Sequence, residues 1–221
     1  MTESAPDDAE RLEPKLLRAA LERLADEPAE RLSLRQIAQD LGVSHQAPYV
    51  HFGSRRRFLA AVAGVGMAEA TVRARALVAA AGDHGSARLH ALADAYLAFI
   101  REQPHVHDLA NGPTVAKSDH PLLQQAAIGY WDLLHDTIAA CQPDGTPEPE
   151  VLRRAAVTWA TVYGISRLSA FGQLPASIPA SADELIHGAI DQLIAGWQYA
   201  GGSLPHQRDA PASRQSVGSR I

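Results

Sequence analysis

The sequence predicts an all-α protein. Alanine and leucine dominate a composition in which 46% of the residues are hydrophobic and 5% are aromatic. Apolar residues recur every three or four positions, which is the period of a helix with one buried face. Glycine, proline and serine separate these segments, as helix ends and caps require. A chain of 221 residues is long enough for one or two domains with a substantial core.

The first predicted helix follows an acidic N-terminus. Residues 1–12 are rich in Asp, Glu, Ser and Pro, and we expect them to be disordered. Pro14 suits the first turn of a helix that ends before Pro28. The apolar stripe of this helix consists of Leu16, Leu17, Ala20, Leu21 and Leu24. We expect it to support the two helices that follow.

Residues 32–59 have the order of a helix-turn-helix. Ser33 is placed to cap a helix, and Gln36 completes a capping box. Gly42 stands where a left-handed residue ends a helix. The apolar stripe between them is Leu34, Ile37, Ala38 and Leu41. A short turn containing glycine between two short helices is typical of this motif, whose second helix enters the major groove of DNA.

The second helix of the motif is predicted from His45 to about His51, with Ser44 as its cap. Proline is tolerated only in the first turn of a helix, so Pro48 predicts a short helix that starts close to Gln46. The residues expected to pack it on the first helix are Val43, Ala47 and Val50. Those left facing outward are His45, Gln46 and Tyr49, whose polar groups suit base edges and phosphates.

Local charge supports a nucleic-acid contact. The window 31–57 holds five arginines and one aspartate, a net charge of +4, whereas the whole chain is at −5. A basic patch on an acidic protein is the footprint expected when one face meets DNA.

These residues resemble the tetracycline-repressor (TetR) family of bacterial transcription regulators. The matching pieces, in order, are Ser33, Ile37-Ala38, Gly42-Val43-Ser44, Tyr49-x-His51-Phe52, Ser54-Arg55 and Phe58-Leu59. Arg55 stands where a lysine is usual, which keeps a cation able to reach phosphate, and Pro48 stands where an aliphatic residue is commoner. The residues expected to contact double-stranded DNA are Ser33, Arg35, Ser44, His45, Gln46, Tyr49, His51 and Arg55.

Longer helices are predicted beyond this motif. Ser54 caps a segment from 55 to about 81, which would span ~40 Å and leave the DNA-binding domain. Gly64 and Gly66 within it mark either a bend or a close packing contact, and we favour packing. The other predicted helices cover about 87–102, 121–140, 150–171 and 182–200, with loops at 111–120 and after Pro143. The expected organisation is a disordered segment 1–12, a DNA-binding domain 13–59, an effector and dimerisation domain 60–200 and a disordered tail 201–221.

The last two predicted helices have wide apolar faces, which indicates self-association. The resemblance also implies a homodimer, since the family usually dimerises through its last two long helices and one helix-turn-helix reads only half of a palindromic operator. The interface residues expected are Leu185, Ile186, Ala189, Ile190, Leu193 and Trp197. Residues 159–164, Trp-Ala-Thr-Val-Tyr-Gly, also look like the Trp-x-x-x-His-Gly pattern of one regulator subgroup, with Tyr163 replacing histidine.

A pocket for a small-molecule effector is predicted between the long helix and the dimer layer. Large amphipathic side chains suit such a pocket, although each is also an ordinary core residue. The lining residues expected are Met67, Tyr96, Phe99, Trp131, His135, Trp159, Tyr163 and Phe171. The function expected is a repressor that a small apolar or amphipathic ligand releases from its operator by tilting the 55–81 helix.

Other functions find less support in the sequence. No phosphate-binding loop, nucleophile elbow or zinc-protease motif occurs, so we expect no enzyme and no cofactor. His105-Val106-His107-Asp108 has alternating metal-ligand types on a predicted loop, which is weak evidence for a metal. Cys141 is the single cysteine. No secretory signal or membrane span is apparent, so a cytoplasmic protein is expected. The alternative function is a helical small-molecule sensor or an enzyme without DNA binding.

Overall fold

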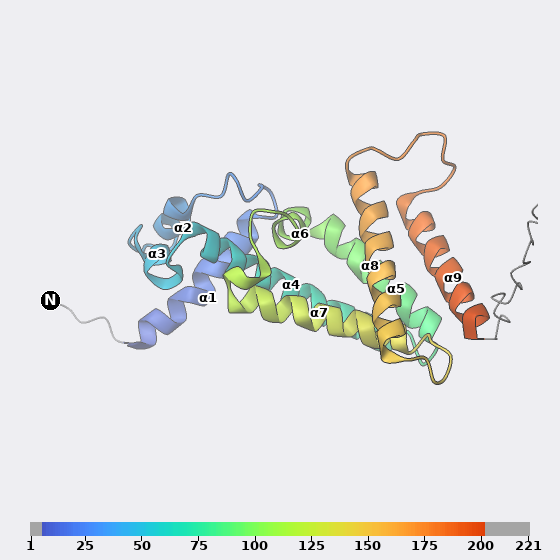
Figure 1. Cartoon of the computed structure of the whole chain (residues 1–221). Coiled ribbons are helices and arrows are strands. Elements are labelled where there is room, and N and C mark those ends of the chain that lie inside the picture. The colour runs from blue at the N-terminus through green and yellow to red at the C-terminus, as the bar shows by residue number, and fades with distance from the viewer. Residues whose placement is uncertain (1–5, 202–221) are drawn as a thin grey trace, which may run out of the picture.

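A computed structural model describes residues 6–201, in which every regular element is helical. The elements in chain order are α1 (Pro6–Arg23), α2 (Leu34–Asp40), α3 (Ala47–Phe52), α4 (Arg55–Ala80), α5 (Gly85–Glu102), α6 (Pro104–Asn111), the 3₁₀ helix η1 (Lys117–Asp119), α7 (Pro121–Ala139), α8 (Glu148–Ala170) and α9 (Ala182–Gly201). Helices α1 to α3 form a small head at one end, and α5 to α9 form a larger body at the other (Figure 1). The predicted fold class is confirmed. The expected disordered tail lies almost wholly outside the described residues.

The head packs around leucines of α1 and α2. Leu16 of α1, Leu24 just after α1 and Ile37 of α2 are fully buried, which agrees with the predicted apolar stripes. The start of α1 is different from the prediction, because the helix begins at Pro6 and holds Pro14 in its interior. Residues 6–12 were therefore wrongly expected to be disordered. The prediction of disorder rested on the acidic composition of this segment, which does not prevent the helix from continuing through it.

Helix α4 joins the head to the body. Its 26 residues run from beside α3 to the far end of α5, and α7 lies alongside it for much of that length (Figure 1). Phe58 and Leu59, near its start, are buried against the head. Helix α4 therefore contributes to one continuous hydrophobic core that extends from the head into the body.

Helix α6 corrects a second expectation. The segment containing His105 and His107 was predicted to be a loop, but Pro104 occupies the first turn of a helix there instead of only ending α5. Val106 and Leu109 are buried on this helix. Among the elements described, none is long and apolar enough to cross a membrane.

The glycines of α4 are explained by packing and not by a bend. A Cβ atom at Gly64 would lie 2.5 Å from the backbone nitrogen of Leu123, and one at Gly66 would lie 2.4 Å from Cγ1 of Val106. Only glycine permits these approaches of α7 and α6 to α4. Gly129 of α7 differs, because a Cβ atom there would meet nothing within 4 Å.

This difference predicts opposite effects of the same substitution. Gly64→Ala should lower the free energy of unfolding by about 1–3 kcal/mol, the usual cost of overpacking a tight contact. Gly129→Ala should raise it by about 0.5–1 kcal/mol, because alanine favours a helix and fits without a clash. Urea unfolding followed by circular dichroism measures both. A stable Gly64→Ala variant would contradict the close α4–α7 contact.

Candidate DNA-binding surface and effector cavity

Helix α2 has the predicted cap at its start and the predicted glycine after its end. The hydroxyl of Ser33 accepts a hydrogen bond of 3.3 Å from the backbone N–H of Gln36, and Gly42 has a φ of +68°. The reciprocal half of the capping box is not formed. The Gln36 amide instead donates to the Asp40 carboxylate at 2.8 Å. That hydrogen bond, and then the ion pair with Arg23, hold the pKa of Asp40 below its usual range.

Helix α3 is as short as Pro48 predicts. It has six residues and starts at Ala47, beside the predicted Gln46. Its buried residues are Pro48 and Phe52, whereas Val50 is 79% exposed. The prediction that Val50 packs on α2 was therefore wrong. The apolar pair Pro48 and Phe52, four residues apart, is the sequence signal for the true inner face.

Polar side chains surround the exposed face of α3. His45, Gln46 and Tyr49 are exposed there, as predicted, together with Val50. The prediction that Ser44 caps α3 was wrong, because the N-cap residue is Gln46. The Ser44 hydroxyl instead accepts a hydrogen bond of 3.3 Å from the backbone N–H of Gln46 in the turn before the helix. This face offers donors, acceptors and one apolar group, the combination that distinguishes base pairs in a major groove.

Arg55 has a different role from the one predicted. Its Nη2 donates to the carbonyl oxygens of Ala29, Glu30 and Leu32, with distances of 3.4 Å to Glu30 and 3.3 Å to Leu32. The guanidinium therefore ties the start of α4 to the connection between α1 and α2. These hydrogen bonds give Arg55 a structural role that the sequence did not predict, and its predicted phosphate contact stays a prediction.

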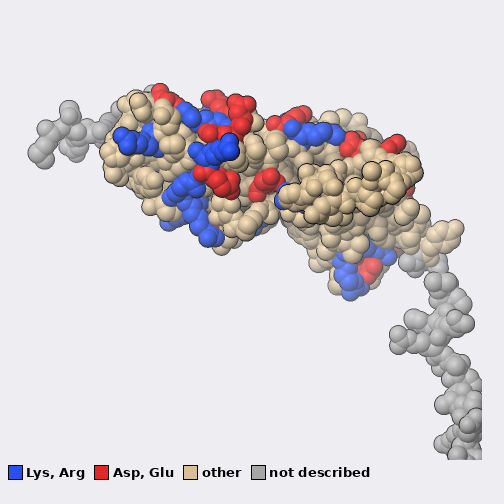
Figure 2. Space-filling view, turned by 90° about the horizontal axis from the view of Figure 1, so that it is seen from above, with Lys and Arg blue, Asp and Glu red and all other residues tan. Residues whose placement is uncertain are grey.

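The next two arginines, Arg56 and Arg57, have different surroundings. Nε of Arg56 lies 2.6 Å from Oδ2 of Asp119, which joins α4 to η1 of the body. Arg57 is exposed. In Figure 2 basic side chains lie beside acidic ones over the head half of the molecule, so its positive surface is local and not continuous. Arg31 and Arg35 are exposed as well.

His51 is turned away from the outer face of α3. Its Nδ1 lies 3.2 Å from the Glu13 carboxylate of α1, and its side chain is only 15% exposed. His51 therefore joins α3 to α1, and little of its side chain is left accessible for the predicted DNA contact.

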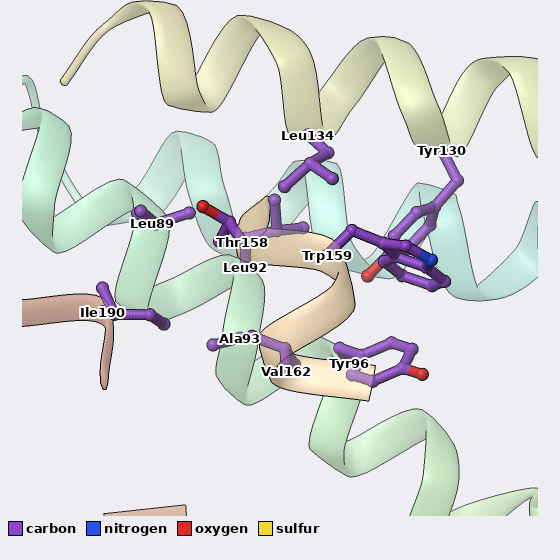
Figure 3. Close-up of a pocket in the computed structure, with 10 residues that line it drawn as sticks. All are labelled: Leu89, Leu92, Ala93, Tyr96, Tyr130, Leu134, Thr158, Trp159, Val162 and Ile190. Carbon is purple, nitrogen blue, oxygen red and sulfur yellow. The ribbon is translucent and has the colours of Figure 1, made fainter. Parts of the chain in front are cut away.

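A small apolar cavity lies in the body between α5, α7, α8 and α9. Its volume is about 20 Å³, room for roughly one water molecule. Figure 3 shows the Trp159 side chain beside Tyr130, with leucines closing the other end. The lining residues are Leu89, Leu92, Ala93, Tyr96, Tyr130, Leu134, Thr158, Trp159, Val162 and Ile190, none of which is charged.

Only part of the predicted pocket converges here. Tyr96 and Trp159 line the cavity with ring centroids 5.3 Å apart, and Tyr163 stacks on Trp159 at 5.9 Å. Phe99 is buried beside His107, and Met67 is buried in the core away from the cavity lining.

Three of the predicted pocket residues are corrected outright. Trp131 is exposed, Phe171 is 62% exposed, and His135 is flanked by the carboxylates of Asp136 and Glu148. Tyr130 was not predicted to line the pocket, although it lies on the same helical stripe as Ala126 and Leu134. The neighbouring Trp131 was predicted in its place.

His107 forms the polar end of the aromatic cluster. Its side chain is 2% exposed, and its Nε2 lies 2.9 Å from the Tyr96 hydroxyl. Burial, opposed by the nearby Asp108 carboxylate, lowers the pKa of His107. His107, which the sequence offered as a candidate metal ligand, therefore links Tyr96 of the cavity wall to α6. Across the described residues, no three His, Cys, Asp or Glu side chains are arranged to hold a metal ion.

The lowered pKa of His107 predicts a pH dependence of stability. Below the unfolded pKa of about 6.5 the unfolded chain takes up a proton that the folded protein resists, so the stabilising contribution is present above that pH and lost as the pH falls. His120, whose pKa burial also lowers, acts in the same direction. His107→Gln, which keeps an acceptor for Tyr96, should flatten the fall in unfolding free energy between pH 7 and 5. Urea titrations at several pH values test this, and parallel curves would contradict it.

The predicted dimer residues are largely used inside the protomer. Ile186, Ile190 and Trp197 are buried, and Ile190 lines the cavity. Leu185, Ala189 and Leu193 are half-buried. Helix α9 packs on α5 and α8, so Ile186, Ile190 and Trp197 are not available to a partner, whereas an interface role of Leu185, Ala189 and Leu193 stays a prediction.

Another surface of α8 and α9 remains apolar and open. Its members on α8 recur every four residues and are Leu152, Ala156, Ala160, Gly164 and Leu168. Gly188 and Gly196 lie on α9, and a Cβ atom at any of these three glycines would meet nothing within 4 Å. Glycine inside a helix costs about 1 kcal/mol relative to alanine. No contact within the described chain requires these glycines.

Cys141 is buried, and burial raises the pKa of its thiol to about 11. The thiol is therefore protonated at neutral pH and poorly suited to redox sensing.

A helix-turn-helix head joined by one long helix to a helical body with an internal cavity defines a DNA-binding transcription regulator. Residues 16–62 match the bacterial regulatory proteins of the tetR family, and residues 89–193 match the tetracyclin repressor-like C-terminal domain. The chain belongs to the TetR family.

Solved structures share this fold. A protein of unknown function from Rhodococcus sp. RHA1 is 31% identical, with a TM-score of 0.68, over 84% of this chain and 95% of that one. A TetR variant of Acinetobacter baumannii AYE in complex with minocycline is 19% identical, with a TM-score of 0.58, over 85% and 97%. The TetR-family regulator PfmR of Thermus thermophilus is 14% identical, with a TM-score of 0.54, over 82% and 97%. No curated protein sequence matches the chain.

Proposed function

We propose that this regulator is a homodimeric repressor that leaves a palindromic operator when a small, uncharged ligand enters the body. The observation that carries the proposal is the pairing of exposed polar residues at the start of α3 with an uncharged aromatic cavity, whose walls α5 and α7 pack against the long helix α4. Since its target would be chromosomal DNA, we place the protein in the bacterial cytoplasm.

The head would read DNA with a smaller set of residues than the sequence alone suggested. Gln46 and His45 precede α3, where side chains of a recognition helix reach base edges. Tyr49 and the missed Val50 extend the same exposed face, and valine suits a thymine methyl group. Ser33 and Ser44 stabilise the turn, while Arg35 and Arg57 supply charge for phosphates.

Two substitutions should distinguish residues that contact bases from residues that contact phosphates. Gln46→Ala should relax base preference at one operator position, at a cost of about 1–3 kcal/mol for the preferred base. Arg57→Gln should weaken binding to every sequence alike and lower the salt slope by about one for each protomer. Fluorescence anisotropy with operator variants, at several salt concentrations, measures both quantities. Equal losses on all sequences for both variants would refute this division.

The dimer would form through the open apolar surface of α8 and α9 and not through the buried stripe of α9. Small residues at Ala156, Ala160 and Gly164 permit close approach of two helices. A two-fold pair would place two copies of α3 in successive major grooves, roughly 34–36 Å apart or a multiple of that distance. A head on its own would contact only one half-site.

The effector would be uncharged. Its cavity offers apolar and aromatic walls, and an ionised group placed there without a partner would cost several kcal/mol. The present volume of about 20 Å³ cannot hold such a ligand, so Trp159 and neighbouring aromatic side chains would have to move apart.

The structure suggests how that movement would reach DNA. Tyr96 lines the cavity and is hydrogen-bonded to His107 of α6, while α6 presses Val106 against α4 at Gly66. An outward shift of α6 would therefore change the position of α4 and the separation of the two heads. A coupling free energy of about 1–3 kcal/mol is enough to regulate operator binding.

The experiment that tests this function combines DNA and ligand binding. Purified protein should shift a duplex from its own upstream region at low salt, and uncharged aromatic compounds from a small library should release it. Trp159→Leu should alter release without altering affinity in the ligand's absence, whereas the exposed Trp131→Leu serves as the matched control. Failure to bind any duplex at low salt would refute the proposal.

A further inference from the structure

Two open grooves on the outer face of the molecule meet at the joint between head and body. One, of about 670 Å³, runs between α4 and α7, and the other, of about 610 Å³, runs between α1 and α4. Val65 of α4 lines both. At their junction Arg18 of α1 is paired with Glu69 of α4 at 2.7 Å. Neither groove includes a residue of the aromatic cavity.

The groove between α4 and α7 is hollow because of its small residues. Gly64 holds α7 tightly against α4 at one end. At the other end Gly129 adds no side chain, and its carbonyl oxygen accepts a hydrogen bond of 3.0 Å from Nη2 of Arg75. Val72 is 68% exposed and Leu122 is 37% exposed beside this hollow. Its walls are therefore mainly apolar although they face solvent, which is unfavourable without an occupant.

The rims of the two grooves are positively charged. They include four cations, Lys15, Arg18, Arg73 and Arg75, and two anions, Glu22 and Glu69. The negative charge of Glu69 is already compensated by Arg18. An occupant that is apolar along its length and negatively charged at one end would match both the floor and the rim.

We propose that this joint groove binds a free alkyl carboxylate such as decanoate, with its alkyl chain between α4 and α7 and its carboxylate near Arg73 and Arg75. The volume is within the range of small-molecule sites, and a guanidinium forks well onto a carboxylate. The site is separate from the uncharged cavity in the body. It would bind a negatively charged ligand, whereas the cavity would bind an uncharged one. It does not depend on the proposed operator binding.

Such a ligand would act at the joint. It would contact α4, which carries the head, and its chain would extend towards Val65, where the α1 groove begins. The Arg18–Glu69 pair crosses this point, so occupancy would restrain α1 against α4. The groove therefore provides a second input to the same long helix.

Isothermal titration of the full-length protein with decanoate, below the concentration at which decanoate forms micelles, tests the site. We expect saturable binding by the wild type and by Gly129→Ala. Gly129→Leu should fold, since its Cβ atom meets nothing within 4 Å, but its side chain should fill the groove. We expect it to weaken decanoate at least about tenfold, the loss expected when two methylene groups stay in water. Unchanged affinity in Gly129→Leu would overturn the proposal.

A second comparison tests the charged end. Arg73→Gln with Arg75→Gln should weaken decanoate about threefold to tenfold, as expected for exposed ion pairs, and leave 1-decanol unaffected. Trp159→Leu should leave decanoate binding unchanged, because Trp159 lines the separate cavity. Tighter binding of decyltrimethylammonium than of decanoate, or loss of decanoate binding in Trp159→Leu, would overturn the assignment.

Discussion

Replacing Ala160 by arginine is expected to convert the regulator into a folded monomer that no longer holds its operator. Ala160 lies at the centre of the open α8 surface, between Ala156 and Gly164. A cation buried there against a second copy would lack a partner, which costs several kcal/mol. Operator affinity should fall by about 10²–10⁴, the advantage that two linked heads have over one. Sedimentation equilibrium and anisotropy measure the two effects.

The control for this variant is Ala79→Arg, which adds the same charge at an exposed position near the end of α4. It should remain dimeric and bind the operator normally. Circular dichroism should show native helix content for both variants, because neither site is in the core. An Ala160→Arg protein that stays dimeric at micromolar concentration would place the interface elsewhere.

Replacing Arg55 by alanine is expected to destabilise the head by about 2–3 kcal/mol. The substitution removes a charged donor group from three backbone carbonyls at positions 29, 30 and 32. Thermal unfolding of the whole protein should shift down by about 5–10 °C. DNA affinity should fall as well, because the connection between α1 and α2 would no longer fix α4.

The salt dependence decides whether Arg55 supports the fold or contacts phosphate. If it ties the head together, Arg55→Ala lowers affinity at every salt concentration and leaves the slope of affinity against salt unchanged. Arg55→Lys, which keeps a donor, should restore most of the stability. A flattened slope with unaltered thermal unfolding would show that Arg55 reaches DNA after all.

The helix-turn-helix could be predicted because its signals are local. Ser33, Gly42 and Pro48 specify a cap, a turn and a short helix through their own backbone chemistry, and neighbouring segments hardly alter those preferences. The start of α1 and the existence of α6 were harder to predict. Pro14 was predicted to start a helix, but helical residues precede it. Pro104 was predicted to end a helix, but helical residues follow it.

The candidate sites were less predictable, because they depend on which helix covers which face. Arg55 and His51 lie in the DNA-binding segment, yet their partners are carbonyls and a carboxylate of distant residues. An apolar stripe such as Ile186 and Ile190 has the same sequence pattern whether it packs on its own chain or on a partner. The sequence identified the aromatic residues of the body, but it did not predict which of their side chains point into the cavity and which face solvent.

The most direct measurement of the central claim is selection of bound sequences from random duplex DNA by the full-length protein at low salt. A dimer that reads DNA with α3 should enrich an inverted repeat, with two protomers on each bound duplex. Gln46→Ala should broaden the preference symmetrically in both half-sites. Absence of any enriched sequence, or enrichment of a single half-site by a monomer, would contradict the account.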